Sequence, residues 1–252
     1  ISRKICKIFE HIHPNRLQFN IKEHRSRSKS KIYLQLQTLT TKKTMKKLLI
    51  VTGPQGSGNH LFARLFSLHP NVMGWEKLHD KYWVPSDEEP FARFWVKPQE
   101  LTKEHFADGE YFCANVSVPF FYDGVRRTPM IKEVAMRAFE LGVLPIIAVI
   151  VRDRNINELQ QVRVGGECTI DTALEYYKDM AVHFIDHEAF FLYKGKYMEY
   201  LGRTLDFPVT KKGIDNFISV DANHKYVFPC KEHWLDKEIR KGREPFTQRP
   251  EE

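Results

Sequence analysis

The sequence predicts a three-layer α/β domain with a central parallel sheet. From Met45 onward, short apolar runs of strand length alternate with longer stretches whose apolar residues recur at helical spacing. Lys46–Thr52 and Val143–Val151 contain apolar runs, and strands near the centre of a parallel sheet, buried on both faces, have this composition. We therefore expect one α/β domain over residues 45–230, followed by a charged C-terminal tail over 231–252.

Composition excludes several classes of protein. With 42% hydrophobic and 28% charged residues, the chain is neither collagen-like nor wholly disordered. Its longest apolar run, Val143–Val151, is about half of what crossing a bilayer needs, so we expect no membrane span. The 4 cysteines form no Cys-x-x-Cys pair, which indicates neither a zinc site nor a disulfide framework. A reducing, cytoplasmic setting is expected.

The positive charge of the chain lies at its beginning. Residues 1–44 hold 11 of the 39 Lys and Arg residues and 2 of the 32 Asp and Glu residues, a net charge of +9. The remaining residues then have a net charge of −2, so no nucleic acid is expected to bind residues 45–252. Because Met45 stands directly before the first strand, we expect 1–44 to be a disordered basic leader or no part of the native protein. A nucleic-acid-binding arm and a transit peptide are the alternatives.

The elements follow in order along the chain. A strand ends at Gly53, and a helix with apolar residues from Leu61 to Leu68 follows it and ends before Pro70. Residues 71–107 lack a clear period and predict an irregular, surface-facing insertion that shapes a substrate mouth. Its aromatic residues would suit sugar or lipid stacking, or packing on the sheet.

The second half predicts further helices and strands. After a strand at Tyr111–Val118, Thr128 is expected to cap a helix that has Pro129 at its first position and ends at Gly142. Four further elements are expected after Val151: a long helix from Thr169 or Asp171 through Ile185, a strand or helix at Phe190–Tyr193, and shorter helices at Met198–Leu205 and Ile214–Ile218.

The spacing Gly53-x-x-x-x-Gly58, between a strand and a helix, predicts a loop whose backbone N–H groups hold phosphate oxygens. The fold would then be P-loop NTPase-like. Asn59 stands where such loops carry lysine, and His60 stands where a hydroxyl would hold magnesium. We therefore expect an anion other than Mg-ATP and no metal; a tight glycine turn without a ligand is the alternative.

The run from Gly56 to Pro70 resembles the signature of sulfotransferases. In that family a loop of the type Arg-Ser-Gly-Thr-Thr-Leu-Leu leads into a helix that ends in His-Pro, and Ser57-Gly58, Leu61 and His69-Pro70 match it. The resemblance implies 3′-phosphoadenosine 5′-phosphosulfate (PAPS) as co-substrate, without a metal. It assigns the phosphosulfate to these loop residues: Gly56, Ser57, Gly58, Asn59, His60 and Leu61.

A second segment supports the resemblance. Ile150-Val151-Arg152-Asp153 is similar to the family's Val-Arg-Asp-Pro, whose arginine binds the 3′-phosphate. Arg152 takes that position, and a guanidinium suits bidentate phosphate binding. Gln160 falls where the family has a helical serine, and its amide could donate a hydrogen bond to the same phosphate.

The resemblance also points to Glu76 as the general base, because several glycan and protein-tyrosine sulfotransferases carry a glutamate at this place. A carboxylate beside Trp75 and away from water could have a raised pKa suited to accepting a hydroxyl proton. An ordinary solvated cluster with His79 is the alternative, and His79 and His60 are reserve candidates. His183 and His187 have metal-like spacing on the expected long helix, but an incidental pair is the preferred interpretation.

The loop lacks the family's basic residue, because that position falls on Gly56. His60 is the expected replacement, since a protonated imidazole at the start of a helix could donate a hydrogen bond to a bound anion. Arg154 and Arg64 are ranked below it.

Together these residues predict a sulfotransferase that moves the sulfuryl group from PAPS to a hydroxyl or amine of a small molecule or glycan, and a lipid acceptor is also open. The alternatives are a P-loop kinase or NTPase and an inactive sulfotransferase-like nucleotide-binding module.

Overall fold

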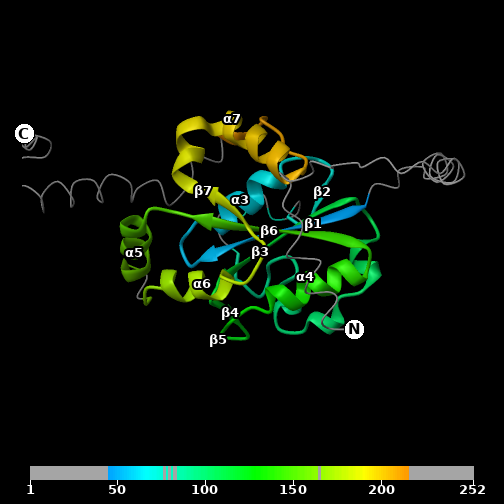
Figure 1. Ribbon diagram of the computed structural model, residues 1–252, viewed down its shortest axis with the longest axis horizontal. Coiled ribbons are helices and arrows are strands. Elements are labelled where there is room, and N and C mark those ends of the chain that lie inside the picture. Colours follow the sequence, from blue (N-terminus) through cyan, green and yellow to red (C-terminus); the bar gives the residue numbers. More distant parts are fainter. Residues whose placement is uncertain (1–44, 76–77, 79–80, 82–83, 164–165, 216–252) are drawn as a thin grey trace, which may run out of the picture. The chain divides into compact units, whose positions relative to one another are not determined.

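The computed structural model describes residues 45–75, 78, 81, 84–163 and 166–215. The chain divides after Met45 into two units, and all the described helices and strands belong to the unit that begins at Lys46. Figure 1 gives their arrangement.

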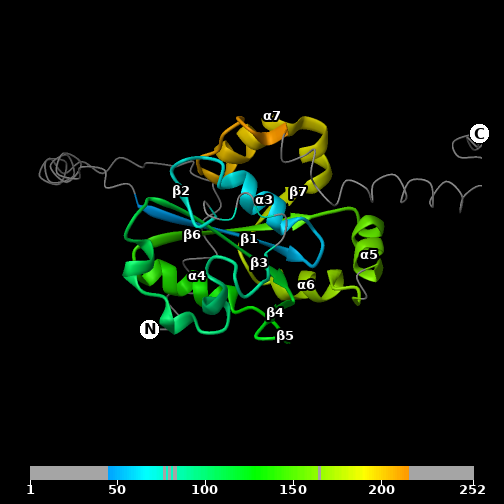
Figure 2. The ribbon, with the colours of Figure 1, turned by 180° about the vertical axis from the view of Figure 1, so that it is seen from behind.

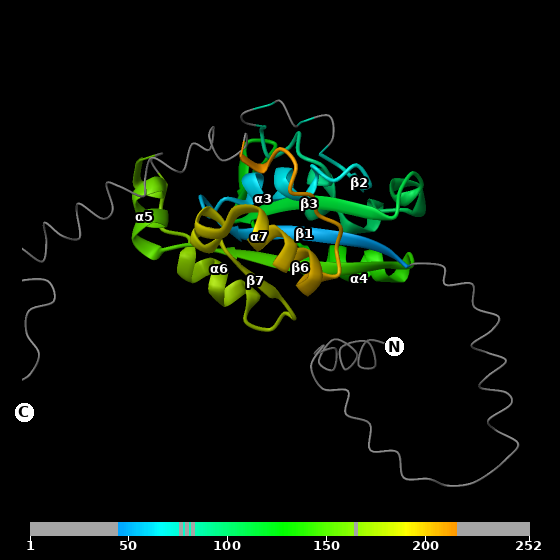
Figure 3. The same ribbon diagram turned by 90° about the horizontal axis from the view of Figure 1, so that it is seen from above.

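A five-stranded parallel sheet forms the centre of the domain, in the order β2-β3-β1-β6-β7. Figure 3 shows these strands from above. The strands are β1 (Lys46–Pro54), β2 (Val72–Met73), β3 (Tyr111–Val118), β6 (Val143–Val151) and β7 (His183–Asp186). The prediction that the first strand and Val143–Val151 lie near the centre of the sheet is confirmed. The two strands are neighbours, because Leu49 pairs with Cys113 on one side and with Ile146 on the other.

Helices cover both faces of the sheet, which confirms the three-layer prediction (Figures 1 and 2). Because side chains alternate along a strand, Leu49 and Val51 of β1 face one layer, and Leu48 and Ile50 face the other. The first layer holds α3 (Asn59–Phe66) and α7 (His187–Leu205), and the second holds α4 (Ile131–Glu140) and α6 (Ile170–Tyr177). Helix α5 (Arg154–Arg163) follows the carboxyl end of β6.

The insertion at 71–107 is irregular, as predicted, but much of its aromatic content is internal. Besides β2 it contains three short 3-10 helices: η1 (Ala92–Trp95), η2 (Pro98–Glu100) and η3 (Lys103–Phe106). Phe94, Trp95 and Phe106 are buried in the second layer, and Trp75 is buried in the first. Packing on the sheet therefore accounts for these rings. Beyond it, β4 (Phe120–Tyr122) and β5 (Val125–Arg127) form a small antiparallel pair.

The prediction of one long helix through Ile185 is wrong. Helix α6 ends at Tyr177, and His183–Asp186 forms the edge strand β7 beside β6. Ile185 is buried and Phe184 is exposed, which is the alternation of an edge strand. A short apolar run cannot be assigned to a strand or a helix by its own pattern, and here the free edge of β6 decides.

Two further predictions about helices, the cap of α4 and the elements that form α7, also differ from the structure. Thr128 does not cap α4, whose N-cap is Met130; instead the Ile131 N–H donates to the Tyr176 hydroxyl at 3.0 Å, and that hydroxyl donates to the Pro129 carbonyl. Phe190–Tyr193 and Met198–Leu205 both belong to α7, which changes direction at Lys194. Ile214 and Asp215 are helical, while the rest of the predicted last helix and the tail over 231–252 lie outside the described residues.

Candidate functional site

The glycine loop joins the central strand β1 to helix α3. Gly56 (φ 79°) and Gly58 (φ 102°) have left-handed backbone conformations that a side chain would disfavour, and Gly58 is the N-cap of α3 without a side-chain cap. Along the chain, β2 and β3 lie on one side of β1, and the later strands β6 and β7 lie on its other side. The carboxyl end of β1 is therefore the switch point at which parallel sheets commonly bind ligands.

Asn59 holds the loop to the neighbouring strand. Its side chain is buried, its Oδ1 accepts a hydrogen bond from Ser57 Oγ at 2.8 Å, and its Nδ2 donates to Ser117 Oγ at 3.0 Å. Asn59 thus has a structural task at the position where an ATP-binding loop has its lysine, and Leu61 is buried in the core. Because the side chains of Asn59 and Leu61 pack inside the protein, the backbone N–H groups of the loop are the groups suited to bind a ligand.

A buried amide network holds the other side of the loop. Gln161 Nε2 donates to the Gln55 carbonyl and to Thr169 Oγ1, and the Gln55 N–H donates to the same Thr169 hydroxyl at 3.1 Å. Thr169 and Gln161 are both buried. Sequence reasoning missed this contribution, although a buried face on α5 could have indicated it.

Arg152 and Gln160, predicted to act together, do lie together and reach the loop. Arg152 Nη1 is 3.2 Å from the Gly56 carbonyl and 3.2 Å from Gln160 Oε1, and donates to both. Its side chain is fully buried, and its Nε lies 3.4 Å from Glu188 Oε1. Burial alone would raise the pKa of Glu188, but a hydrogen bond and the charge of His187, together with Arg152, lower it. Arg152 therefore joins the loop to α5 and α7 through a compensated buried charge.

His187 is a second residue at this site, and sequence reasoning did not assign it there. A Cβ atom on Gly58 would lie 2.5 Å from His187 Cδ2, so the imidazole packs directly against the loop. His183 is on β7 and His187 begins α7, so the prediction that both lie on one long helix is wrong. The described residues contain no cluster of His, Cys, Asp and Glu that could hold a metal.

His60 lies in the first turn of α3 and contacts a buried carboxylate, Glu89. His60 Nε2 is hydrogen bonded to Glu89 Oε1, and the His60 ring lies 5.6 Å from the Trp75 ring. Burial raises the pKa of Glu89, and its hydrogen bonds to His60 and Asn115 offset part of that rise. Glu89 was not predicted; its place in the acidic run before Pro90 resembles a solvated surface.

The predicted base Glu76 and the reserve candidate His79 lie outside the described residues. Arg64 is on α3 one turn beyond His60. Arg154 is half exposed, and its guanidinium contacts Glu158 and Asp171, as expected of a surface residue.

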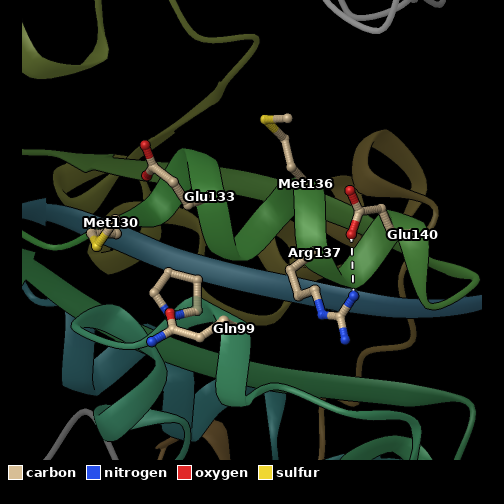
Figure 4. Close-up of a pocket in the computed structure, with 7 residues that line it drawn as sticks. Gln99, Met130, Glu133, Met136, Arg137 and Glu140 are labelled. Atoms are coloured by element: carbon tan, nitrogen blue, oxygen red, sulfur yellow. Dashed lines mark hydrogen bonds and ion pairs between the residues drawn. The ribbon is translucent and has the colours of Figure 1, made fainter. Parts of the chain in front are cut away.

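A shallow depression of about 290 Å³ lies elsewhere, between η2 and α4 (Figure 4). Pro98, Met130 and Arg137 are among its lining residues, and Arg137 pairs with Glu140. It contains none of the loop residues and offers no buried polar group that would orient a ligand.

The described part of the chain has no helix that is both long and apolar enough to span a membrane. Comparison with models of known protein families gives no match, and no curated protein matches the sequence.

Proposed function

We propose that this protein binds PAPS at the glycine loop and transfers its sulfuryl group to a hydroxyl or amine of a small molecule or glycan. One observation carries the proposal. The two segments that resemble sulfotransferases are about a hundred residues apart in sequence, yet Arg152 of the second donates a hydrogen bond to Gly56 of the first.

The loop suits the phosphosulfate. Its amides lie at the start of α3, where the helix dipole and the uncapped N–H groups favour an anion. In this assignment Gly56, Ser57, Gly58, Asn59, His60 and Leu61 act through their backbones, with His60 also contributing its ring. The side chain of Asn59 keeps the loop in shape.

Arg152 and Gln160 would bind the 3′-phosphate. Arg152 Nη1 already donates to Gln160 Oε1 and the Gly56 carbonyl, so a phosphate there would join an existing network beside the loop. Glu188 balances the charge of the buried guanidinium. The arrangement is that of a preorganised arginine, which loses little side-chain entropy on binding.

In the transfer step, the acceptor oxygen forms a bond to sulfur while the bond from sulfur to the bridging phosphate oxygen breaks. The electron pair stays on that phosphate oxygen and leaves with adenosine 3′,5′-bisphosphate. Glu76 is the proposed base for the acceptor proton. Most of the acceleration would come from alignment and from donors that stabilise the leaving oxygen.

Isothermal titration with two nucleotides tests the donor site. We expect the wild type to bind adenosine 3′,5′-bisphosphate more tightly than 5′-AMP, by about tenfold or more for one charge-assisted phosphate contact. Arg152→Ala should lose this preference while still binding 5′-AMP. Arg154→Ala is the matched control, because Arg154 is nearby and pairs with surface acids.

If the wild type binds neither nucleotide, the donor assignment is wrong. Equal preference in the wild type and Arg152→Ala would remove only the 3′-phosphate assignment. An inactive nucleotide-binding module is the second candidate, favoured by the absence of a basic residue at Gly56; it would bind the bisphosphate and transfer no labelled sulfuryl group in a broad acceptor screen. Turnover of Mg-ATP would instead indicate a kinase.

A further inference from the structure

A cluster of polar side chains lies inside the protein beside the glycine loop. Its members come from three segments: Trp75 and Glu89 from the insertion, His60 from the start of α3, and Asn115 from β3. Glu89 is hydrogen bonded to both His60 and Asn115. The His60 ring lies 5.6 Å from the ring of Trp75, which is fully buried. The cluster therefore joins the insertion to the sheet and to the first helix.

The cluster borders the loop at the carboxyl edge of the sheet. Asn115 is two residues before Ser117 on the same face of β3, so the two are about 7 Å apart along the strand. Ser117 Oγ accepts a hydrogen bond from the loop residue Asn59 at 3.0 Å, and His60 follows Asn59 directly. A molecule the size of one sugar could therefore contact both the cluster and the loop.

Two buried groups of the cluster lack full compensation. Asn115 is 1% exposed, and its Oδ1 has no hydrogen-bond partner among the residues that the structure describes. The Glu89 side chain is 5% exposed, and burial raises the pKa of its carboxyl more than the contacts with His60 and Asn115 lower it. Because an unpartnered buried acceptor costs about 1–3 kcal/mol, Asn115 needs a donor, and an ionised Glu89 needs a positive charge.

An ammonium group supplies both, since it carries three N–H donors and a positive charge. A hydroxyl supplies one O–H donor and no charge, so it could satisfy Asn115 but not compensate Glu89. The buried Trp75 keeps water from screening such a pair. The His60 side chain is 33% exposed, so the cluster reaches the surface at this ring.

We propose that Glu89 and Asn115 form a subsite for a protonated primary amine, and that the acceptor is a small amino alcohol or amino sugar. Its ammonium group binds at the subsite while a hydroxyl of the same molecule reaches the glycine loop. A protonated amine has no lone pair to attack sulfur, so the sulfuryl group goes to the hydroxyl oxygen. The assignment of the acceptor rests on the proposed function; the amine subsite can be tested without nucleotide.

The experiment is an isothermal titration of the nucleotide-free protein with glucosamine and with glucose, at a pH of about 6, where the amine is protonated. The two sugars differ only in the ammonium group that replaces one hydroxyl. The wild type should bind glucosamine about tenfold more tightly than glucose, because one charge-assisted hydrogen bond separates them.

Two variants and one control assign the preference to the subsite. Glu89→Gln keeps the size of the side chain and removes its charge, so the preference for glucosamine should disappear. Asn115→Leu removes Oδ1 at nearly constant size and should weaken the preference. Glu88→Gln is the matched control, because Glu88 is exposed and pairs with Lys81, and it should keep the wild-type preference.

Equal wild-type affinity for the two sugars, or binding of neither, would overturn the inference and leave a buried water as the partner of Asn115. An undiminished preference in Glu89→Gln would also overturn it, and Asn115→Leu decides in the same way if Glu89→Gln does not fold. With PAPS, glucosamine should exceed glucose in kcat/KM and carry the sulfate on oxygen; sulfate on nitrogen would overturn the acceptor assignment. If glucosamine is preferred but adenosine 3′,5′-bisphosphate does not bind, the proposed function fails and the amine subsite stands.

Discussion

At the scale of single residues, Gly58 shows how closely the site is packed. Its φ of 102° favours glycine, and His187 occupies the space that a side chain would fill. Two independent constraints therefore act on one position, one from the backbone and one from a helix more than a hundred residues away in sequence.

The variant Gly58→Ala should be destabilised on both counts. Left-handed backbone costs a residue with a Cβ about 1–2 kcal/mol, and forcing the His187 ring aside adds about 1–3 kcal/mol. Gly142→Ala is the control, because Gly142 has a φ of 84° and a Cβ there would meet nothing within 4 Å. Urea unfolding should give the larger loss for Gly58→Ala; equal losses would contradict the proposed packing of His187.

At the scale of elements, a side chain from α6 caps the start of α4. The Tyr176 hydroxyl accepts from the Ile131 N–H and donates to the Pro129 carbonyl. Burial raises the pKa of Tyr176 to about 12, so the hydroxyl stays protonated and able to donate beyond the pH at which an exposed tyrosine ionises.

Replacing Tyr176 with Phe should lower the free energy of unfolding at pH 7 by about 1 kcal/mol, because two hydrogen bonds at the helix start are lost. In the wild type the unfolded state ionises near pH 10, before the native hydroxyl does, so stability should fall as pH rises from about 10 to 12. Tyr176→Phe should flatten that fall. Urea unfolding at pH 7, 9 and 11 measures this pH dependence of the free energy of unfolding. Tyr200→Phe is the control at pH 7, because Tyr200 is half exposed. If Tyr176→Phe loses stability with pH as steeply as the wild type does, the proposed cap is contradicted.

At the scale of the whole molecule, a boundary after Met45 separates the basic first unit, residues 1–45, from the α/β unit. All the residues assigned to the candidate site follow this boundary in sequence, and those described lie on, or in the loops between, the strands of one sheet and its helices.

A chain that begins at Met45 should therefore keep the melting temperature and bisphosphate affinity of the full chain. Both are measured on the two proteins side by side, by calorimetry and titration at several salt concentrations. A large loss of affinity on deletion, especially one that high salt also produces in the full chain, would mean that the basic residues 1–44 contribute to binding.

The sequence by itself determined the parallel sheet, its two central strands, the glycine loop and the first helix. These features depend on local signals: the apolar runs of β1 and β6, and glycines at positions 56 and 58 where the chain adopts left-handed backbone. The layers could be predicted as well, since alternation and helical spacing are properties of neighbouring residues.

Only the tertiary structure decided the features that depend on contacts between segments far apart in the sequence. His183–Asp186 is a strand because β6 offers an edge, and α4 starts at Ile131 because Tyr176 reaches it. Glu89 becomes a buried partner of His60 because the insertion packs it against α3 and β3. These features depend on burial and on hydrogen bonds between distant segments. Neither can be recognised from the pattern of neighbouring residues in the sequence.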